Sequence, residues 1–426
     1  MRLFKRTAIL ACSSVLAVGV FAQAAPKPAA KPKQVVTGPV AVYWMDTATS
    51  SGMSGMMGAG KPSMSSIMGG MMGGGNNISH TLNLALGSSQ AASGELAANH
   101  LPPADLNVGN TLPLYWQGTK AVAEKPMQDD TPHDYEPPKG KILIFWGCGD
   151  HAPKNQPVVI DLSKLTDPAA RMQTMKQMMP LNAIALDNVH PPRPNDWKSF
   201  GEWPNKKGGK APNGDSSLIG AHAVKGNYSP DIAFSLSDTQ DFLPPIEMTG
   251  NDKTAVGNVA LTWRAMPRAR GFIATAIGGG QDTVVMWTSA EVQTAWMGMA
   301  PQYLTANDVD RLQAQKALMP GSATACTVPA EVMASSQALI YGLTAYGADA
   351  NFSYPPRPED AATPWNIQWE TKVRYRTSTG GMLGQNMGQM GARSDDSAPA
   401  TNEPDKKKKK GSMFGNILKQ GAGLIP

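Results

Sequence analysis

Short runs of alternating or continuous apolar residues recur along most of the chain and predict β-strands. These runs are rich in β-branched and aromatic residues, and turns rich in glycine, proline or polar residues separate them. The predicted strands cover residues 35–45, 80–86, 112–116, 141–146, 157–162, 231–236, 258–265, 271–277, 282–289, 338–346, 350–354 and 365–377. Helical patterns occur at residues 167–179, before Pro180, and at residues 307–317, after Thr305 as N-cap. The pattern predicts a mostly-β fold of antiparallel β-sandwich units with two short helices.

Turn-rich stretches suggest how the strands divide into domains. We expect a first β-sandwich domain at 35–187, interrupted by a loop rich in glycine and methionine at 50–75, and a second β-sandwich domain at 216–378. Residues 188–215 are dense in proline, lysine, asparagine and glycine and predict a linker or loop. Residues 379–426 predict a disordered tail. The similar runs at 142–146 and 259–263, each ending in tryptophan, favour a duplicated sandwich unit.

The first residues have the pattern of an export signal. A basic start is followed by an apolar run and by Ala22-Gln-Ala24, so residues 1–24 predict a cleaved signal peptide. Residues 25–34 predict an extended linker rich in proline and lysine. The expected destination is the periplasm, an outer-membrane-associated position or the extracellular space.

One segment resembles a known family. Residues 259–273, in which Trp263 precedes a small-residue turn at Ala269 and an aromatic Phe272, resemble the B and C strands of fibronectin type III and immunoglobulin-like domains. This resemblance implies a β-sandwich fold. The chain also resembles uncharacterised exported bacterial proteins. Neither resemblance implies an activity, because sandwiches of this kind serve adhesion, accessory and structural roles alike.

Charge and motifs exclude several classes of function. The formal net charge of +5 arises at the two ends of the chain, and the body between them is nearly neutral, so a nucleic-acid partner is not expected. The sequence contains no P-loop, no Gly-x-Ser-x-Gly elbow and no His-Glu-x-x-His helix.

Two cysteines remain after the signal peptide, Cys148 and Cys326. Export permits a disulfide between them, although spacing alone leaves a pair of buried thiols equally open. Cys148 lies in Trp146-Gly-Cys-Gly-Asp-His151, where a thiol beside Asp150 and His151 could serve as a nucleophile or metal ligand. A structural cysteine at the end of a strand is the favoured interpretation, because neighbouring side chains on an extended strand point to opposite faces.

Methionines crowd the first glycine-rich loop and suggest a second candidate site. Thioethers are soft ligands that select Cu(I), so a copper site is the alternative to a cofactor-free protein. A flexible loop that packs on a partner is the favoured interpretation. The candidate ligands are Met53, Met56, Met57, Met64, Met68, Met71, Met72 and His80.

The tail combines a basic run with a short apolar stretch. Such a combination could contact an anionic membrane surface weakly, whereas a solvated tail is the favoured interpretation. The candidate contact residues are Lys406, Lys407, Lys408, Lys409, Lys410 and Phe414.

Together these patterns predict an exported, non-enzymatic β-sandwich protein of the bacterial cell envelope, an interaction or structural module whose partner is a protein or another envelope component. The alternatives are a periplasmic, methionine-rich copper-binding protein and an exported hydrolase whose catalytic residues have no recognisable motif.

Overall fold

The computed structural model describes residues 34–57, 78–116, 140–166, 189–280, 282–294 and 299–385, with a few isolated residues between these ranges. The described chain is mostly β, which confirms the predicted fold class. The signal peptide at 1–24, most of the linker at 25–34, most of the helix predicted at 167–179 and residues 386–426 of the predicted tail lie outside the described residues. The tail prediction began too early, because residues 379–382 belong to the strand β20 (Trp369–Met382). In the part of the chain that the structure describes, no helix is long and apolar enough to cross a membrane.

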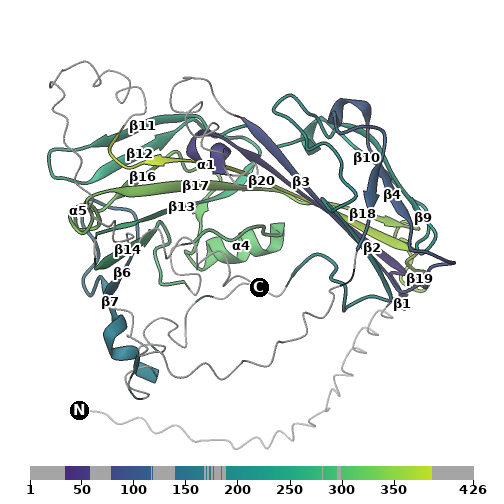
Figure 1. Cartoon of the computed structure of the whole chain (residues 1–426), viewed down its shortest axis with the longest axis horizontal. Coiled ribbons are helices and arrows are strands. Elements are labelled where there is room, and N and C mark those ends of the chain that lie inside the picture. Colours follow the sequence, from purple (N-terminus) through teal and green to yellow (C-terminus); the bar gives the residue numbers. More distant parts are fainter. Residues whose placement is uncertain are drawn as a thin grey trace, which may run out of the picture.

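One large sheet runs the length of the structure (Figure 1). In spatial order its strands are β7 (Val158–Asp161), β6 (Lys141–Trp146), β14 (Thr283–Thr288), β13 (Ala269–Gly279), β17 (Leu339–Gly347), β20 (Trp369–Met382), β2 (Ala41–Ser50), β3 (Ser79–Ser88) and β8 (Ser199–Trp203). Two further strands extend it, since β15 (Met319–Pro320) pairs with β13 and β18 (Ala350–Tyr354) pairs with β20. The sheet is mixed, because β2 runs parallel to β20 and β6 runs parallel to β14.

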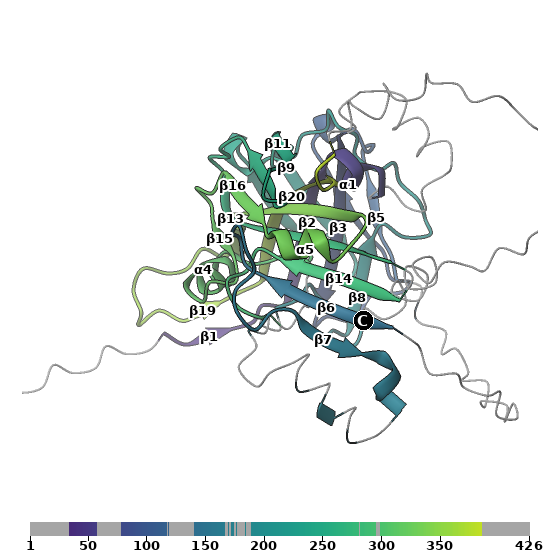
Figure 2. The ribbon, with the colours of Figure 1, turned by 90° about the vertical axis from the view of Figure 1, so that its left-hand side faces the viewer.

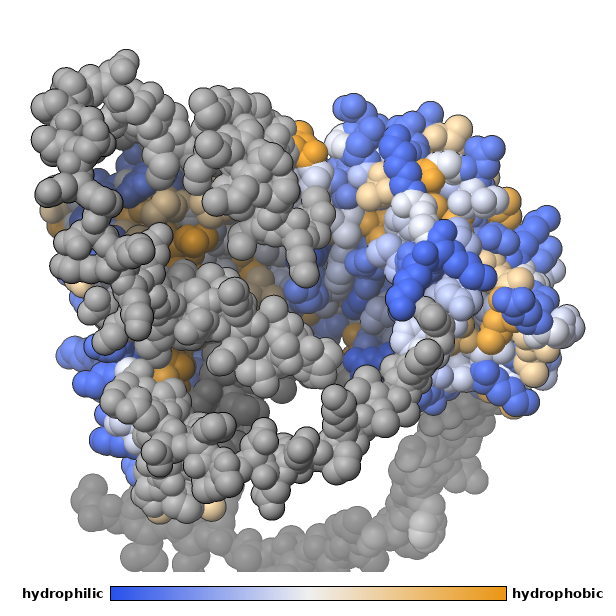
Figure 3. Space-filling model, viewed as in Figure 1, coloured by the Kyte–Doolittle hydropathy of each residue, from blue (hydrophilic) through white to orange (hydrophobic). Residues whose placement is uncertain are grey.

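Two smaller sheets pack on the same face of the large sheet, which we call its inner face. The first contains β10 (Ile232–Leu236), β9 (Gly220–Gly226), β4 (Ala98–Leu101) and β5 (Leu112–Leu114). The second contains β11 (Met248–Lys253), β12 (Val259–Trp263) and β16 (Ala325–Val328). Figure 1 shows the first at the right and the second at the upper left. On the outside of the first sheet, the surface is mostly hydrophilic with isolated hydrophobic residues (Figure 3).

Each smaller sheet encloses its own apolar core. The first core contains Tyr43 and Leu84 of the large sheet together with Val224 and Ile232 of the four-stranded sheet. The second core packs Phe272 and other residues of the large sheet against the three-stranded sheet and contains the fully buried Trp287. The structure therefore has two sandwich cores that share one sheet.

These cores do not follow the predicted domain boundaries. Strands from both sides of residues 188–215 alternate within the large sheet, and β8 of that predicted linker is itself one of its strands, pairing with β3. The two runs compared as a duplication also differ, because β6 belongs to the large sheet and β12 to the three-stranded sheet. Trp263 is buried, whereas Trp146 is half-buried. A division into sequential domains is therefore wrong, since pairing between distant strands decides the layers.

The remaining elements are short. They are the helices α1 (Gly52–Met57), α4 (Ala306–Ala314) and α5 (Ala330–Ala334), the 3₁₀ turns at Ala104–Leu106, Leu162–Thr166 and Asp238–Gln240, and the parallel pair β1 (Val36–Thr37) and β19 (Trp365–Asn366). Helix α4 lies on the outer face of the large sheet (Figure 1), where it buries Val309 and Leu312 against Ile273 and Tyr346. An end view shows α4 to one side of the stacked strands (Figure 2). The predicted N-cap is present, because the Thr305 hydroxyl accepts a hydrogen bond from the backbone N–H of Asp308.

A disulfide joins Cys148 and Cys326, whose Cα atoms lie 5.3 Å apart. Cys148 follows β6 of the large sheet and Cys326 lies on β16 of the three-stranded sheet, so the bridge ties the two layers around the second core. In the structure the two cysteines are therefore a bonded pair rather than two thiols.

Polar groups cross the first core in a single hydrogen-bonded chain. The buried imidazoles of His100 and His222 lie 3.2 Å apart (Nε2 to Nδ1), and His100 Nδ1 lies 3.0 Å from the Tyr43 hydroxyl. His222 Nε2 lies 2.7 Å from the carbonyl oxygen of Leu218 and must donate to it. Therefore His222 Nδ1 accepts from His100 Nε2–H, and His100 Nδ1 accepts from the Tyr43 hydroxyl. Both histidines are neutral in this arrangement, which links the large sheet to the four-stranded sheet.

We expect removal of the disulfide to destabilise the protein substantially. In the chain-entropy model, a bridge that spans 178 residues stabilises the folded state by up to about 5 kcal/mol. Urea unfolding of the double variant Cys148→Ser/Cys326→Ser should show a loss of about 2–5 kcal/mol, and reduced wild-type protein should match it. Free thiols in the denatured, unreduced wild type would contradict the bridge.

We expect stability to fall as the pH is lowered from about 7 to 5. Burial lowers the pKa of His100 well below its ordinary value and also lowers the pKa of His222. The unfolded chain therefore binds more protons than the folded one below about pH 6.5, and each histidine can contribute a slope of up to about 1.4 kcal/mol per pH unit. Free energies of unfolding at several pH values should show this slope.

The matched comparison uses a buried and an exposed histidine. His100→Gln should reduce the acid slope, because one of the two buried titrating groups is gone. His151→Gln should leave it unchanged, since that side chain is 70% exposed. Equal slopes for wild type and His100→Gln would show that the buried pair does not cause the acid sensitivity.

Candidate functional site

The outer face of the large sheet carries an unusual concentration of charge where β2 and β20 lie side by side. Successive side chains of a strand point to opposite faces, so Trp44 and Asp46 on β2 share the outer face with Lys372, Arg374 and Arg376 on β20. The parallel register places Trp44 opposite Lys372 and Asp46 opposite Arg374. The inner-face residues of the same strands, such as Tyr43 and Val373, belong to the first core.

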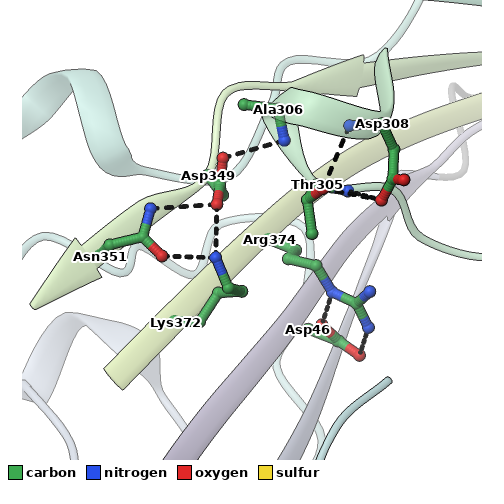
Figure 4. A network of polar contacts seen from close by, with 8 residues as sticks. All are labelled: Asp46, Thr305, Ala306, Asp308, Asp349, Asn351, Lys372 and Arg374. Carbon is green, nitrogen blue, oxygen red and sulfur yellow. Dashed lines mark hydrogen bonds and ion pairs between the residues drawn. The ribbon is translucent and has the colours of Figure 1, made fainter. Parts of the chain in front are cut away.

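Asp46 and Arg374 form a buried, two-pronged ion pair. Arg374 Nε donates to Asp46 Oδ1 and Nη2 donates to Oδ2, both at 2.7 Å (Figure 4). The side chains are only 8% and 5% exposed. Two parallel hydrogen bonds satisfy the carboxylate and much of the guanidinium, and they fix both groups in place.

Aromatic rings flank this ion pair. The Arg374 guanidinium lies 4.6 Å from the centre of the Trp44 ring and 5.1 Å from that of Tyr303, and Arg376 lies 4.8 Å from the Tyr303 ring. Burial raises the pKa of the Tyr303 hydroxyl, with a smaller opposing effect of Arg376. These contacts place the cationic groups over aromatic faces, an arrangement that is favourable when both are removed from water.

A second polar cluster ties helix α4 to the sheet beside the ion pair. Lys372 Nζ donates to Asp349 Oδ2 at 2.7 Å, and Asp349 Oδ1 accepts from the backbone N–H of Ala306, the first residue of α4 (Figure 4). Asn351 bridges the pair, because its side chain contacts both Asp349 and Lys372. Hydrogen bonds from Lys372, Asn351 and the Ala306 backbone lower the pKa of Asp349 and outweigh the effect of its burial.

An open groove of about 410 Å³ begins at Trp44 and Asp46 and crosses β3 to β8. A neighbouring hollow of about 290 Å³ shares Trp44, Pro191 and Pro192 with it. The other residues that line the two parts are Val42, Asn83, Leu84, Ala85, His190, Arg193, Asp196, Trp197, Glu202, Trp203 and Pro204.

The segment after residue 188 forms one wall of this groove because it lies flat on β3. A Cβ atom at Gly87 would come within 2.5 Å of the Trp197 ring, so only glycine allows this close approach. Pro191 and Trp197 are half-buried, while Asn83 and Arg193 are exposed at the rim. The groove therefore combines apolar ring surfaces with hydrogen-bonding groups, which is the usual composition of a ligand site.

The groove also contains the carboxyl group of Glu202. It lies on β8, half-buried, and burial raises the pKa of its carboxyl group. Asp46 is already occupied by Arg374. The groove can therefore hold a ligand through Glu202, Asn83 and Arg193. Among the described residues that line its larger part, it does not offer two unpaired carboxyl groups.

The motif around Cys148 does not form a nucleophilic centre. The sulfur is in the disulfide, Asp150 Oδ1 accepts from the Asn258 side chain, and His151 Nδ1 pairs with Glu331 at 2.9 Å on the surface. The favoured structural interpretation agrees with these contacts, and a thiolate nucleophile or ligand at Cys148 is wrong for this structure.

The predicted copper ligands fall mostly outside the described residues. Met64, Met68, Met71 and Met72 are not described, nor are the side chains of Met56 and Met57, while Met53 is half-buried on α1. His80 lies on β3, where its Nδ1 is 3.1 Å from the Thr49 hydroxyl and its ring stacks on Phe242. Within the described ranges no group of three or more His, Cys, Asp or Glu side chains could hold a metal ion. The candidate membrane residues Lys406 to Lys410 and Phe414 are also outside the described residues.

Sequence patterns missed the residues that build the groove, although two signals were present. Asp46 is a lone acidic residue inside a long apolar strand, and Lys372, Arg374 and Arg376 alternate along another. A single charge in a buried strand requires a partner. No pattern pointed to Glu202 or to the wall at 189–197, because that stretch reads as an ordinary proline-rich loop.

The chain matches no protein-family model and no curated protein sequence. The resemblance to fibronectin type III or immunoglobulin-like domains therefore stays a prediction, and function has to be argued from the groove itself.

We expect loss of the Asp46 charge to be costly. Asp46→Asn would leave the buried Arg374 guanidinium without its counter-ion, which destabilises a protein by about 3–5 kcal/mol. Glu247→Gln is the matched control, because Glu247 pairs with Arg264 at the surface and both side chains are well exposed. Urea unfolding should show a loss of less than about 1 kcal/mol for this control. Similar losses for the two variants would show that the buried pair has no special role.

Proposed function

We propose that the protein is an exported, non-enzymatic binding module of the bacterial cell envelope that holds a polysaccharide chain in the groove beside Trp44. The observation that carries the proposal is the composition of the groove. The half-buried Pro191 lines both parts, the half-buried ring of Trp197 lines the smaller part, and the polar side chains of Asn83, Arg193 and Glu202 line the larger part. Aromatic and proline rings pack on the C–H faces of sugar rings, while amide, guanidinium and carboxyl groups hydrogen-bond their hydroxyls.

The shape of the site also favours a chain-like ligand over a small compact one. The two parts, of about 410 and 290 Å³, join at Trp44 and the Pro191–Pro192 pair and are open to solvent along the sheet surface. A polymer can lie along such a groove, with one sugar unit in each part. The rigid sheet below, fixed by the Asp46–Arg374 pair, keeps the site preformed.

Binding is favoured over hydrolysis because of how the carboxyl groups are used. Glycosidases generally need one carboxyl group as an acid and a second as a base or nucleophile. Asp46 is held by Arg374, and Asp196 is exposed at the far part of the groove, so among the described lining residues Glu202 is the half-buried carboxyl group without an ion-pair partner. An envelope location rests on the predicted signal peptide at 1–24, and the partner is then an envelope polysaccharide.

The test uses peptidoglycan sacculi as the insoluble probe and a soluble chitin oligosaccharide as the second probe. The double variant Asn83→Ala/Glu202→Gln should bind at least about tenfold more weakly in pull-down and calorimetry, because it removes hydrogen bonds worth about 1 kcal/mol each.

The matched control is Asn99→Ala, which removes an exposed asparagine from β4 of the four-stranded sheet. It should bind like the wild type. Equal weakening by the two variants, or no binding of either probe by the wild type, would contradict the proposal. Release of new reducing ends during incubation would instead support the hydrolase alternative.

A copper-binding role is the second candidate, and one observation favours it. Helix α1 follows β2 and packs on the end of β20, where a Cβ atom at Gly52 would lie 2.7 Å from the carbonyl oxygen of Gly380. Met53 on α1 and Met382 at the end of β20 therefore start from the same end of the sheet, and each begins a methionine-rich stretch of the sequence. Cu(I) titration with a competing chelator should then show binding that is lost when residues 53–72 are deleted.

A further inference from the structure

The pairing of three strands fixes the place of Glu202 in the groove. Glu202 on β8 lies opposite Ala85 on β3, and Ala85 lies opposite Trp44 on β2. Directly opposite residues of a sheet share a face, so these three side chains form one row across the outer face. All three line the larger part of the groove. Because Ala85 carries only a methyl group, space remains above it between Trp44 and Glu202.

Glu202 lacks the cation that each of the two buried carboxylates described above has. Arg374 donates two hydrogen bonds of 2.7 Å to Asp46. Lys372 donates one of 2.7 Å to Asp349. Among the described residues Glu202 has no ion-pair partner, and burial raises the pKa of its carboxyl group with no neighbouring cation acting against that effect. A carboxylate that is partly removed from water normally has a partner, so the groove contains one uncompensated negative charge.

Arg193 does not compensate this charge. It lines the same part of the groove, but its side chain is exposed and forms no ion pair with Glu202. Ion pairs between exposed groups contribute little, because water already solvates both charges. A counter-charge from a ligand therefore stabilises the half-buried carboxyl group of Glu202 more than it stabilises the exposed guanidinium of Arg193.

The lining residues near Glu202 suit an ammonium group better than a metal ion. The described residues contain no group of three or more His, Cys, Asp or Glu side chains that could hold a metal. An ammonium group needs only hydrogen-bond acceptors, and Asn83 offers a second one through its side-chain carbonyl oxygen. Asn83 precedes Ala85 by two residues on β3, so it is a diagonal neighbour of Glu202, about 7–8 Å away. An ammonium group above Ala85 can therefore donate to both side chains.

We propose that the groove prefers polysaccharide chains whose sugars carry free amino groups, with one ammonium group donating to Glu202 and Asn83 above Ala85. This inference rests on the polysaccharide-binding function proposed above and names the class of sugar. The ammonium group supplies the positive charge that Glu202 lacks. An N-acetylated sugar places a neutral amide at the same position, so it keeps hydrogen bonds but forms no ion pair.

The test compares two probes by isothermal titration calorimetry: a chitosan oligosaccharide, and the chitin oligosaccharide of the same length, which is its N-acetylated form. The titrations are done at low salt and at a pH where the amino groups of chitosan are protonated. The wild type should bind chitosan at least about tenfold more tightly than chitin, the size expected for a hydrogen bond between charged groups. The preference should decrease as salt is added, because salt screens a partly exposed ion pair.

Glu202→Gln removes the charge and keeps the shape of the side chain, so its affinities for chitosan and chitin should become about equal. Glu95→Gln is the matched control, because it changes the net charge by the same amount at an exposed residue that lines neither part of the groove. It should keep the preference of the wild type for chitosan.

The outcomes separate this inference from the proposed function. Equal binding of chitosan and chitin by the wild type would overturn the inference and leave polysaccharide binding intact, whereas binding of neither would contradict both. A preference that persists in Glu202→Gln, or one that Glu95→Gln loses to the same extent, would also overturn the inference, because the overall charge of the protein would then explain it. The comparison on the wild type needs no variant, so it decides the matter even if Glu202→Gln fails to fold.

Discussion

Pairing between a strand from the beginning of the chain and one from its end holds the large sheet together. Strands β2 and β20 run parallel from the Ala41–Trp369 pair to the Ser50–Ser378 pair, although most of the chain lies between them in sequence. The buried Asp46–Arg374 ion pair lies in the middle of this register. A slip by one residue would turn Asp46 into the first core and Tyr43 to the outer face, so burial and charge specify the same register. Closing so long a loop costs entropy, which the contacts along the two strands offset.

The two faces of β20 have different surroundings. Arg374 points to the outer face, beside the groove, while Tyr375 points to the inner face and the first core. The inner face is covered along its length by the two smaller sheets. Of the described residues, α4 and the segment after residue 188 cover parts of the outer face, and the groove lies between that segment and the sheet. Its polar floor therefore follows from the same alternation that builds the cores.

Local sequence predicted individual elements well where a strand is long or its pattern regular. The predicted bounds of β6 and β18 are those observed, and Thr305 caps α4 as its position before the helix indicated. Strands β4, β8, β9, β11 and β16 were missed because glycine, histidine or polar residues in them obscure the alternation of apolar and polar positions. Hydrogen bonding to a neighbouring strand stabilises these strands; for example, β8 pairs with β3 and β16 pairs with β12. Such pairing overrides weak local propensity.

The sequence by itself determined that the protein is mostly β, which residues of each strand share a face, and that Cys148 and Cys326 have only each other as partners after the predicted signal peptide is removed. Those properties depend on period and composition along a few neighbouring residues. Only the tertiary structure decided that the cores interleave rather than follow one another, that Asp46 meets Arg374, and that Glu202 lies in the groove. A strand's pattern states which side is buried but not which distant strand it will pair with, because that choice depends on contacts summed over the whole sheet.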